Sequence, residues 1–311
     1  MSKPPPKGNE GFELYYAATY GARWETLKQK LADSRRVGRI NRFAAKSDDA
    51  MRHMMGQHYL PAEVTEQRLA AGQLVKGDAA LSTCYVMDLA SIAAPLPLSA
   101  HLADCKQPRV LDLCAAPGGK SLVLAELLWS STPERSASLV VNERSRVRRA
   151  RLINVIREYL PEPIRQKVQV TGHDATRWGL YESDAYDAVL LDAPCSSESH
   201  VLANSNALAQ WSLKRVQRLA AQQYAMAVAA LTALKPGGLL AYSTCSLAPP
   251  ENDGVIERII KKKSELATVV DVPWPSLDGV FAEKTRFGWH AVPDTTGYGP
   301  IYSAYLRKRG G

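Results

Sequence analysis

Two cysteines of this 311-residue chain are the side chains best suited to nucleophilic chemistry. Cys195 lies in Asp192–Ser196 (DAPCS) and Cys245 lies in Tyr242–Leu247 (YSTCSL), and each follows a short apolar run that predicts a buried strand. Ligands of a parallel sheet bind at the carboxyl ends of its strands, so we expect both thiols to face one cleft. The alternative is that both are small apolar fillers of the core, as buried cysteines usually are and as we expect for Cys114.

One reaction in particular needs such a thiol. Carbon 5 of cytosine is too weak a nucleophile to attack a sulfonium methyl group, but a thiolate added at carbon 6 makes carbon 5 enamine-like. Carbon 5 then takes the methyl group and loses its proton, and the thiolate leaves. A nearby helix amino terminus, such as the one expected near Pro250, lowers a cysteine pKa from its usual value of about 8.5. Asp192, protonated or hydrogen-bonded, can bind the N3/N4 edge of the base and offset charge at N3.

A turn of small residues follows the first predicted strand. Asp112–Lys120 (DLCAAPGGK) allows a ligand close to the backbone, and the helix after it favours negative charge. The turn has the spacing of neither a phosphate-binding loop nor a dinucleotide fingerprint. Acids end the next three strands at Glu143, Asp174 and Asp192, which fits a nucleoside cofactor, with Glu143 placed to accept both ribose hydroxyls. The alternative is that each acid caps a helix.

Alternating strands and helices must position these side chains. They predict an α/β fold with a doubly wound, mostly parallel, Rossmann-like sheet of seven strands. The expected strands are 109–114, 139–142, 168–171, 186–191, 239–243, 268–272 and 301–307. The expected helices are 120–129, 145–159, 208–234 and 250–263, the third ending at Lys235–Gly238 (KPGG).

The amino-terminal part has a different pattern. Residues 1–10 are predicted to be a disordered leader, 11–80 a small and mainly helical extension, and 81–311 the S-adenosylmethionine-dependent methyltransferase domain. Helix is expected over 11–46, where Trp24, Leu27 and Leu31 recur at helical spacing. The basic run Arg35–Arg42 is either a solvated helix end or a patch that contacts phosphate.

Composition narrows the class of protein. The net charge of +8 suits a polyanionic partner such as RNA. The five cysteines are odd in number and form no Cys-x-x-Cys pair, so neither a disulfide framework nor a metal site is expected. No apolar run is long enough for a membrane span, and the first ten residues have neither a secretory core nor a clear mitochondrial presequence.

The three motifs DLCAAPGGK, DAPCS and YSTCSL, in this order, resemble the Sun-domain (Nol1/Nop2/Sun) family of RNA cytosine-5 methyltransferases over about residues 80–308. The resemblance implies a class I methyltransferase fold with S-adenosyl-L-methionine as the cofactor. It also implies that Cys245 is the nucleophile and that Cys195 assists product release, beside the catalytic role that the chemistry gives to Asp192. The cofactor contacts that it implies are Cys114, Ala115, Ala116, Pro117, Gly118, Gly119, Lys120, Glu143, Arg148, Asp174 and Asp192.

Two segments are most similar to the mitochondrial member that methylates small-subunit ribosomal RNA. They are Asp192–His200 (DAPCSSESH), which departs from the Cys-Ser-Gly-Thr-Gly run of bacterial members, and Tyr16–Phe43. This similarity implies a mitochondrial matrix location, with the cytoplasm as the alternative. It also implies ribosomal RNA or an assembling ribosomal subunit as the target, and a helical-repeat partner of the mitochondrial termination-factor type.

Two other functions remain open at this point. The chain can be a catalytically silent scaffold for ribosome assembly that keeps the methyltransferase fold, although the intact pair Cys195 and Cys245 disfavours this. A nicotinamide-dependent oxidoreductase is disfavoured because the dinucleotide fingerprint is missing.

Overall fold

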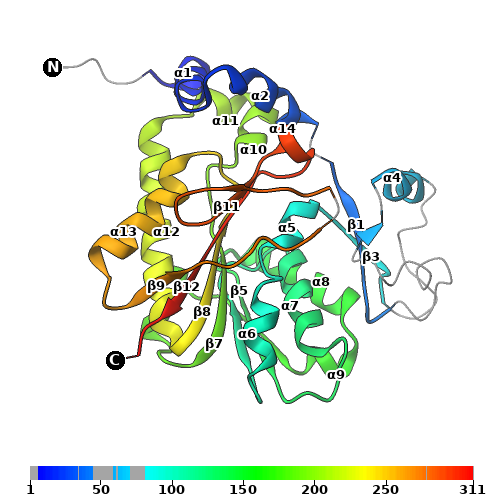
Figure 1. The fold of residues 1–311 in the computed structure, drawn as a ribbon. Coiled ribbons are helices and arrows are strands. Elements are labelled where there is room, and N and C mark those ends of the chain that lie inside the picture. Colours follow the sequence, from blue (N-terminus) through cyan, green and yellow to red (C-terminus); the bar gives the residue numbers. More distant parts are fainter. Residues whose placement is uncertain are drawn as a thin grey trace.

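The computed structural model describes residues 6–33, 35–44, 59–60, 62–70, 81–277 and 279–310 of the chain. Within these ranges the chain forms one large sheet with helices on both faces and a small three-stranded sheet beside it (Figure 1). No helix in the described ranges is both long and apolar enough to cross a membrane.

The large sheet contains all seven predicted strands. Its order is β10-β11-β12-β8-β7-β4-β5-β6, and β9 also pairs with β12. Strands β8, β7, β4, β5 and β6 are parallel, whereas β12 is antiparallel to β8, β9 and β11. The seven strands are β4 (Arg109–Asp112), β5 (Ser138–Asn142), β6 (Val168–Thr171), β7 (Tyr186–Asp192), β8 (Leu234–Thr244), β9 (Ala267–Val270) and β12 (Ile301–Lys308).

Two short strands, β10 (Glu283–Lys284) and β11 (Trp289–Ala291), make the described sheet nine-stranded rather than seven-stranded. They are too short to show an alternating pattern in the sequence. Gly288 precedes β11 and lies so close to β12 that a Cβ there would be 2.2 Å from the Ser303 carbonyl oxygen. The absence of a side chain at Gly288 thus permits the close approach to β12.

Helices cover both faces of the sheet, as its doubly wound order requires. Val110 and Leu111 are neighbours on β4 and point to opposite faces, into two different apolar clusters. The cluster around Val110 includes Leu98, Leu122 and Leu152 from the helices of that face. These helices are α5 (Leu89–Ala93), α6 (Leu98–Ala103), α7 (Gly119–Trp129), α8 (Arg146–Tyr159) and α9 (Glu162–Arg165).

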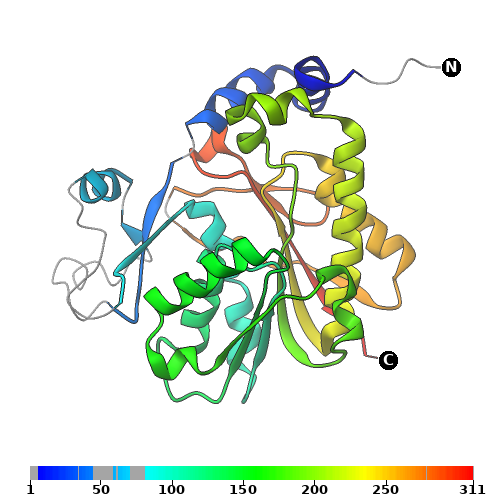
Figure 2. The same cartoon turned by 180° about the vertical axis from the view of Figure 1, so that it is seen from behind.

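The opposite face carries the 3₁₀ segment η3 (Ala175–Leu180) and the helices α12 (Leu213–Ala233) and α13 (Asp253–Lys262), the last preceded by η4 (Pro249–Glu251) (Figure 2). The predicted helix 208–234 is divided. Ser212 caps α12 by accepting from the Arg215 N–H, and Asn204 caps the separate helix α11 (Ser205–Ala209). Two side-chain caps so close together favour two helices over one.

The segment Lys235–Gly238 is not a loop between helix and strand, as its Pro-Gly-Gly sequence suggested. It belongs to β8, whose pairing with β7 shifts register between Tyr186 and Ala188. Gly237, with a φ of +80°, adopts the backbone conformation found at this shift in register. The helix before it ends at Ala233.

The amino-terminal predictions need two corrections. Helix α1 (Gly8–Tyr20) begins inside the predicted leader, and the predicted helix 11–46 ends with α2 (Trp24–Ala32) after η1 (Gly21–Arg23). Val37–Ile40 forms β1 instead, which pairs with β2 (Tyr59–Leu60) and β3 (Cys84–Met87). Most of residues 47–80 lie outside the described residues, apart from β2 and α4 (Ala62–Ala70).

The helical spacing of Trp24, Leu27 and Leu31 is confirmed. These residues form the buried face of α2, and each is at most 2% exposed. These residues pack with Phe12 and Tyr16 of α1 against Trp211. The two amino-terminal helices therefore share a core with the segment that joins α11 and α12.

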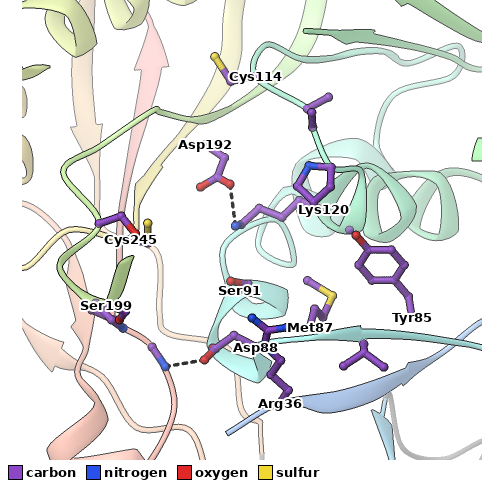
Figure 3. Close-up of a pocket in the computed structure, with 18 of the residues that line it drawn as sticks. Arg36, Tyr85, Met87, Asp88, Ser91, Cys114, Lys120, Asp192, Ser199 and Cys245 are labelled. Atoms are coloured by element: carbon purple, nitrogen blue, oxygen red, sulfur yellow. Dashed lines mark hydrogen bonds and ion pairs between the residues drawn. The ribbon is translucent and has the colours of Figure 1, made fainter. Parts of the chain in front are cut away.

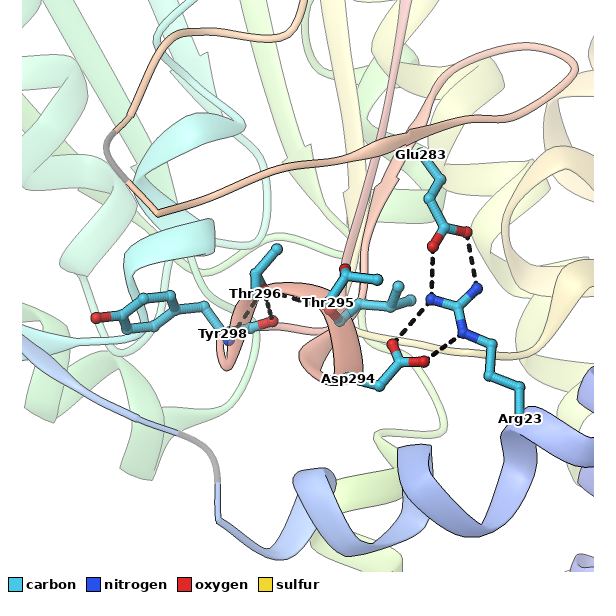
Figure 4. A network of polar contacts seen from close by, with 7 residues as sticks. Arg23, Glu283, Asp294, Thr295, Thr296 and Tyr298 are labelled. Carbon is cyan, nitrogen blue, oxygen red and sulfur yellow. Dashed lines mark hydrogen bonds and ion pairs between the residues drawn. The ribbon is translucent and has the colours of Figure 1, made fainter.

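A salt-bridge cluster fixes these helices to the carboxyl-terminal third of the chain. The Arg23 guanidinium donates to Glu283 of β10 and to Asp294 of α14 (Pro293–Thr296), with an Nη2–Oδ1 distance of 2.8 Å to the latter (Figure 4). Asp294 lies at the start of its short helix, followed by Thr295 and Thr296. The amino-terminal helical segment is thus joined to β10 and α14 through one arginine.

Candidate active site

A cavity of about 460 Å³ opens at the carboxyl ends of the parallel strands. Its walls come from the turn after β4, the ends of β7 and β8, strand β3 and the Gly299–Pro300 bend (Figure 3). The predicted site residues in its lining are Cys114, Ala115, Ala116, Pro117, Gly119, Lys120, Asp192 and Cys245. The structure therefore brings the predicted cofactor turn and one predicted catalytic thiol to the same cavity.

The two predicted catalytic cysteines meet at the carboxyl ends of β7 and β8. Asp192 pairs with Ser243 in the sheet, and the Sγ atoms of Cys195 and Cys245, which lie just beyond, are 3.0 Å apart. Both are free thiols. Cys245 faces the cavity, and Cys195 lies behind it, outside the lining.

The electrostatic environments of the two thiols differ. The hydrogen bond from Cys195 lowers the pKa of Cys245, and a hydrogen bond from Ser197 adds to this effect. The same bond, together with burial, raises the pKa of Cys195 well above its ordinary value. The arrangement favours a thiolate at Cys245 and a donating S–H group at Cys195.

Lys120 and Asp192 form an ion pair in the cavity. Lys120 lies in the first turn of α7, and its Nζ is 2.8 Å from Asp192 Oδ2 (Figure 3). Burial opposes the charge on Lys120, but Asp192 outweighs it and raises the pKa of the ammonium group. Burial also raises the pKa of Asp112 to about 7, and its Oδ2 accepts from Ser121 at 2.6 Å. Lys120 therefore places an ammonium group beside the Asp192 carboxylate, in the same cavity as the Cys245 thiol.

Glycines shape the turn between β4 and α7. Gly118 has a φ of +124°, and a Cβ there would be 2.9 Å from Val155 Cγ1 of α8. At Gly119 a Cβ would be 2.7 Å from the ring of Tyr85 on β3. Gly118 is not part of the cavity lining, so its main effect is to let α7 and α8 pack closely.

The other predicted cofactor residues lie outside the cavity lining. Glu143 is buried; it accepts from the Ser145 N–H at 2.7 Å and pairs with Arg148 at 3.3 Å. Arg148 Nη2 also donates to the Ala116 carbonyl at 2.6 Å, which ties α8 to the turn. Asp174 caps η3 by accepting from the Thr176 N–H at 3.0 Å and pairs with Arg144 at 3.0 Å. Asp174 is thus a helix cap, as the alternative anticipated, whereas Ser145 rather than Glu143 caps α8.

The basic run Arg35–Arg42 does not form one phosphate-contacting patch. Arg39 is only 3% exposed and pairs with the buried Glu126, near which Arg42 also lies at 3.8 Å. Arg36, by contrast, is exposed and lines the cavity (Figure 3). Their positions explain the split, because Arg36 precedes β1 whereas Arg39 lies within this fully buried strand.

Several site residues were not predicted from the sequence. Tyr85, Asp88 and Ser91 line the cavity opposite Lys120, brought there by the pairing of β3 with β1. The carboxylates of Glu198 and Glu251 lie fully buried behind the two cysteines, and burial raises the pKa of Glu251 to about 7. The only sequence signal for Glu198 was its place in the unusual segment that follows Cys195.

Comparisons with known proteins agree with the motifs. The chain matches the family described as 16S rRNA methyltransferase RsmB/F over residues 99–307. Mouse 5-cytosine rRNA methyltransferase NSUN4 is 30% identical over 288 residues, which span 81% of this chain and 73% of that protein. The mouse protein named tRNA (cytosine(34)-C(5))-methyltransferase, mitochondrial, is 29% identical over 257 residues, 80% of this chain and 68% of that protein.

Solved structures confirm the fold. A methyltransferase homologue from Pyrococcus horikoshii superposes with a TM-score of 0.68 at 21% identity, covering 96% of this chain and 94% of that one. The chain therefore belongs to the RsmB/F family, the Sun-domain family of S-adenosylmethionine-dependent RNA cytosine-5 methyltransferases that its motifs resemble.

Proposed function

We propose that the chain methylates carbon 5 of a cytosine in RNA through a covalent bond between Cys245 Sγ and carbon 6 of the base. The observation that carries this proposal is the pair of free thiols 3.0 Å apart, with Cys245 facing a cavity that also holds Asp192 and Lys120. A lone cysteine in that cavity would fit many roles. The pair fits a reaction in which one sulfur must both attack and leave.

The contacts of each side chain suggest its part in the reaction. Cys245 attacks carbon 6 as a thiolate, which its lowered pKa favours. Negative charge then develops toward N3 of the base, where the Lys120 ammonium offsets it while Asp192 accepts from the amino group at carbon 4. Once methylated, carbon 5 passes its proton to a water molecule, and the electrons of that C–H bond re-form the carbon 5–carbon 6 double bond. The carbon 6–sulfur bond breaks at the same time, and the S–H of Cys195 stabilises the departing thiolate.

The lining of the cavity suits the cofactor. S-adenosylmethionine supplies an electrophilic methyl group on a sulfonium ion. Of the three carboxylates in the lining, Asp112 and Asp192 follow the parallel strands and suit its positive charges. Asp112 Oδ1 is buried without a hydrogen-bond partner among the described residues. We propose that Cys114–Lys120 contact the cofactor, with Arg148 holding the turn through Ala116.

We also propose that Glu143 and Asp174 contact the cofactor. For Glu143 to accept ribose hydroxyls, its carboxylate must exchange the pairing with Arg148 for the new contacts. Asp174 must likewise keep its cap on η3 while its second oxygen, now facing Arg144, turns to the cofactor. Both residues are therefore expected to hold the cofactor only after a local rearrangement.

The substrate and setting are also proposals. We propose that the target is ribosomal RNA in a mitochondrial ribosomal subunit under assembly. The family description and the name of mouse NSUN4 support ribosomal RNA, and the name of the mouse tRNA methyltransferase supports a mitochondrial setting. We further propose that residues 81–311 are the methyltransferase domain, that 11–80 extend it, and that a termination-factor-type helical-repeat protein adds RNA affinity.

Bisulfite sequencing of cellular RNA after depletion of the protein tests the function. Loss of one 5-methylcytosine in mitochondrial ribosomal RNA, restored by the unmodified chain and not by Cys245→Ala, is the expected result. Restoration by Cys245→Ala would contradict the covalent mechanism. Loss restricted to a cytoplasmic RNA would support the cytoplasmic alternative, and ribosome defects without any lost methylation would support the scaffold.

A further inference from the structure

The carboxylate of Glu198 lies at the centre of the contacts between the two cysteine loops. Glu198 is 0% exposed and begins α10 (Glu198–Ala203). Ser196, next to Cys195, donates its hydroxyl to Glu198 Oε1 at 2.6 Å, and Ser246, next to Cys245, donates to the same oxygen at 3.2 Å. The two serine hydroxyls are themselves 3.0 Å apart. One carboxylate thus joins the residues that directly follow the two thiols.

Two more donors complete the shell of Glu198. The Leu247 N–H donates to Oε2 at 2.8 Å, which fixes the backbone beyond Cys245. The Tyr16 hydroxyl of α1 donates to Oε1. Tyr20, one turn farther along α1, donates to the Leu247 carbonyl at 2.6 Å. The amino-terminal helix therefore contacts both cysteine loops through one buried cluster.

The backbone beside Glu198 needs such support. Ser197 has a φ of +52°, a left-handed conformation that few residues other than glycine adopt, and its side chain lines the cavity. A strained residue between Cys195 and Glu198 persists only where its surroundings hold it. The Glu198 carboxylate accepts from three hydroxyl groups and one backbone N–H, so an acceptor side chain of this size satisfies all four donors.

We propose that Glu198, with Tyr16 of α1 as its partner, is a positioning residue that holds Cys195 and Cys245 at their working separation. Its relevance to catalysis rests on the proposed covalent function. The effect of Glu198 on the two thiols is independent of that function, because the separation of the sulfurs can be measured without RNA. The amino-terminal helix is then part of the catalytic apparatus rather than an appendage to it.

Glu198→Gln is the sharpest test, because it keeps the shape of the side chain and replaces one acceptor with a donor. The amide NH₂ must then face either the hydroxyl cluster or the Leu247 N–H, a backbone donor that cannot reorient. Phenylarsine oxide reports the thiol geometry: it bridges two adjacent thiols with loss of one water, and intact-mass spectrometry follows the product. Cys195→Ala and Cys245→Ala are the negative controls, because each lacks one of the two thiols that the reagent bridges.

We expect Glu198→Gln to slow this bridging and to lower kcat for methyl transfer about a hundredfold, with the KM for S-adenosylmethionine little changed. Tyr16→Phe keeps the packed ring and should also slow the bridging and lower kcat, by a smaller factor and with the KM little changed. This second variant decides the question if Glu198→Gln folds poorly. The matched control is Glu126→Gln, another buried carboxylate, paired with Arg39. It should lower the melting temperature and leave the bridging rate unchanged.

Unchanged bridging in folded Glu198→Gln and Tyr16→Phe would overturn the positioning role. Equal slowing in Glu126→Gln would also overturn it, because general destabilisation would then explain the effect. Slowed bridging with normal methyl transfer would support the positioning of the thiols and contradict the covalent function proposed for them.

Discussion

Lys120 Nζ lies 2.8 Å from Asp192 Oδ2, at the junction of the turn after β4 and the end of β7. The pair links the predicted cofactor turn to the predicted catalytic motif. Lys120 donates to the Asp192 carboxylate, which is the hydrogen-bonded arrangement expected for this residue.

Replacing Lys120 with methionine removes the cation that we expect to offset charge on the base. The kcat for methyl transfer should fall by about 10²- to 10³-fold, the usual effect of losing one group that stabilises developing charge. Single-turnover methyl transfer measures this. Lys235→Met is the matched control, since Lys235 also pairs with an aspartate, Asp187, at 2.8 Å, at the opposite end of β7. An equal loss of activity in both variants would contradict the role of Lys120.

Gly118→Ala should reduce stability and not only cofactor affinity. The new Cβ would be 2.9 Å from Val155, and the φ of +124° suits glycine alone. Strain of about 1–3 kcal/mol and overpacking of similar size should lower the free energy of unfolding, measured by urea denaturation. Gly237→Ala, with a φ of +80° and open space around its Cβ, should show the strain without the overpacking. A Gly118→Ala variant no less stable than Gly237→Ala would contradict this account.

Because Arg36 is exposed in the cavity and Arg39 is buried, we expect substitutions at these two positions to have different effects. Arg36→Gln should weaken RNA binding and reduce the salt slope by about 0.7 log–log units, as expected for one lost phosphate contact with a single strand. Arg39→Met removes the buried ion-pair partner of Glu126 and should instead lower the free energy of unfolding by about 3 kcal/mol. Filter binding across a salt series, with melting curves, separates the two effects. A reduced slope for folded Arg39→Met would contradict the assignment.

The bond between the two thiols predicts a pH effect. Cys195 lowers the pKa of Cys245 by donating to its thiolate, so Cys195→Ala should raise that pKa. The rate at which iodoacetamide alkylates Cys245 should then rise with pH through a higher midpoint than in the unmodified protein. Peptide mass spectrometry resolves Cys245 from the other thiols. A midpoint that stays or falls would show that Cys195 does not stabilise the thiolate.

Features that depend on local pattern were predictable from the sequence. All seven predicted strands form, because each is an apolar run between turn residues, and Cys195 and Cys245 meet because parallel strand ends share one edge. Strand β1 was mistaken for helix because its partner β3 lies far along the chain, so nothing local marks it. Glu198 was missed for the same reason: three of its four donors come from α1 and from the loop after β8.

The central claim, that Cys245 forms the covalent bond and Cys195 helps to break it, is tested most directly by trapping the bond. Each protein is incubated with labelled RNA and S-adenosylmethionine and run on a denaturing gel. Cys195→Ala should still attack but release slowly, and so accumulate a protein–RNA adduct, whereas Cys245→Ala should give neither adduct nor methylation. An adduct with Cys245→Ala and none with Cys195→Ala would contradict the assignment of the two thiols.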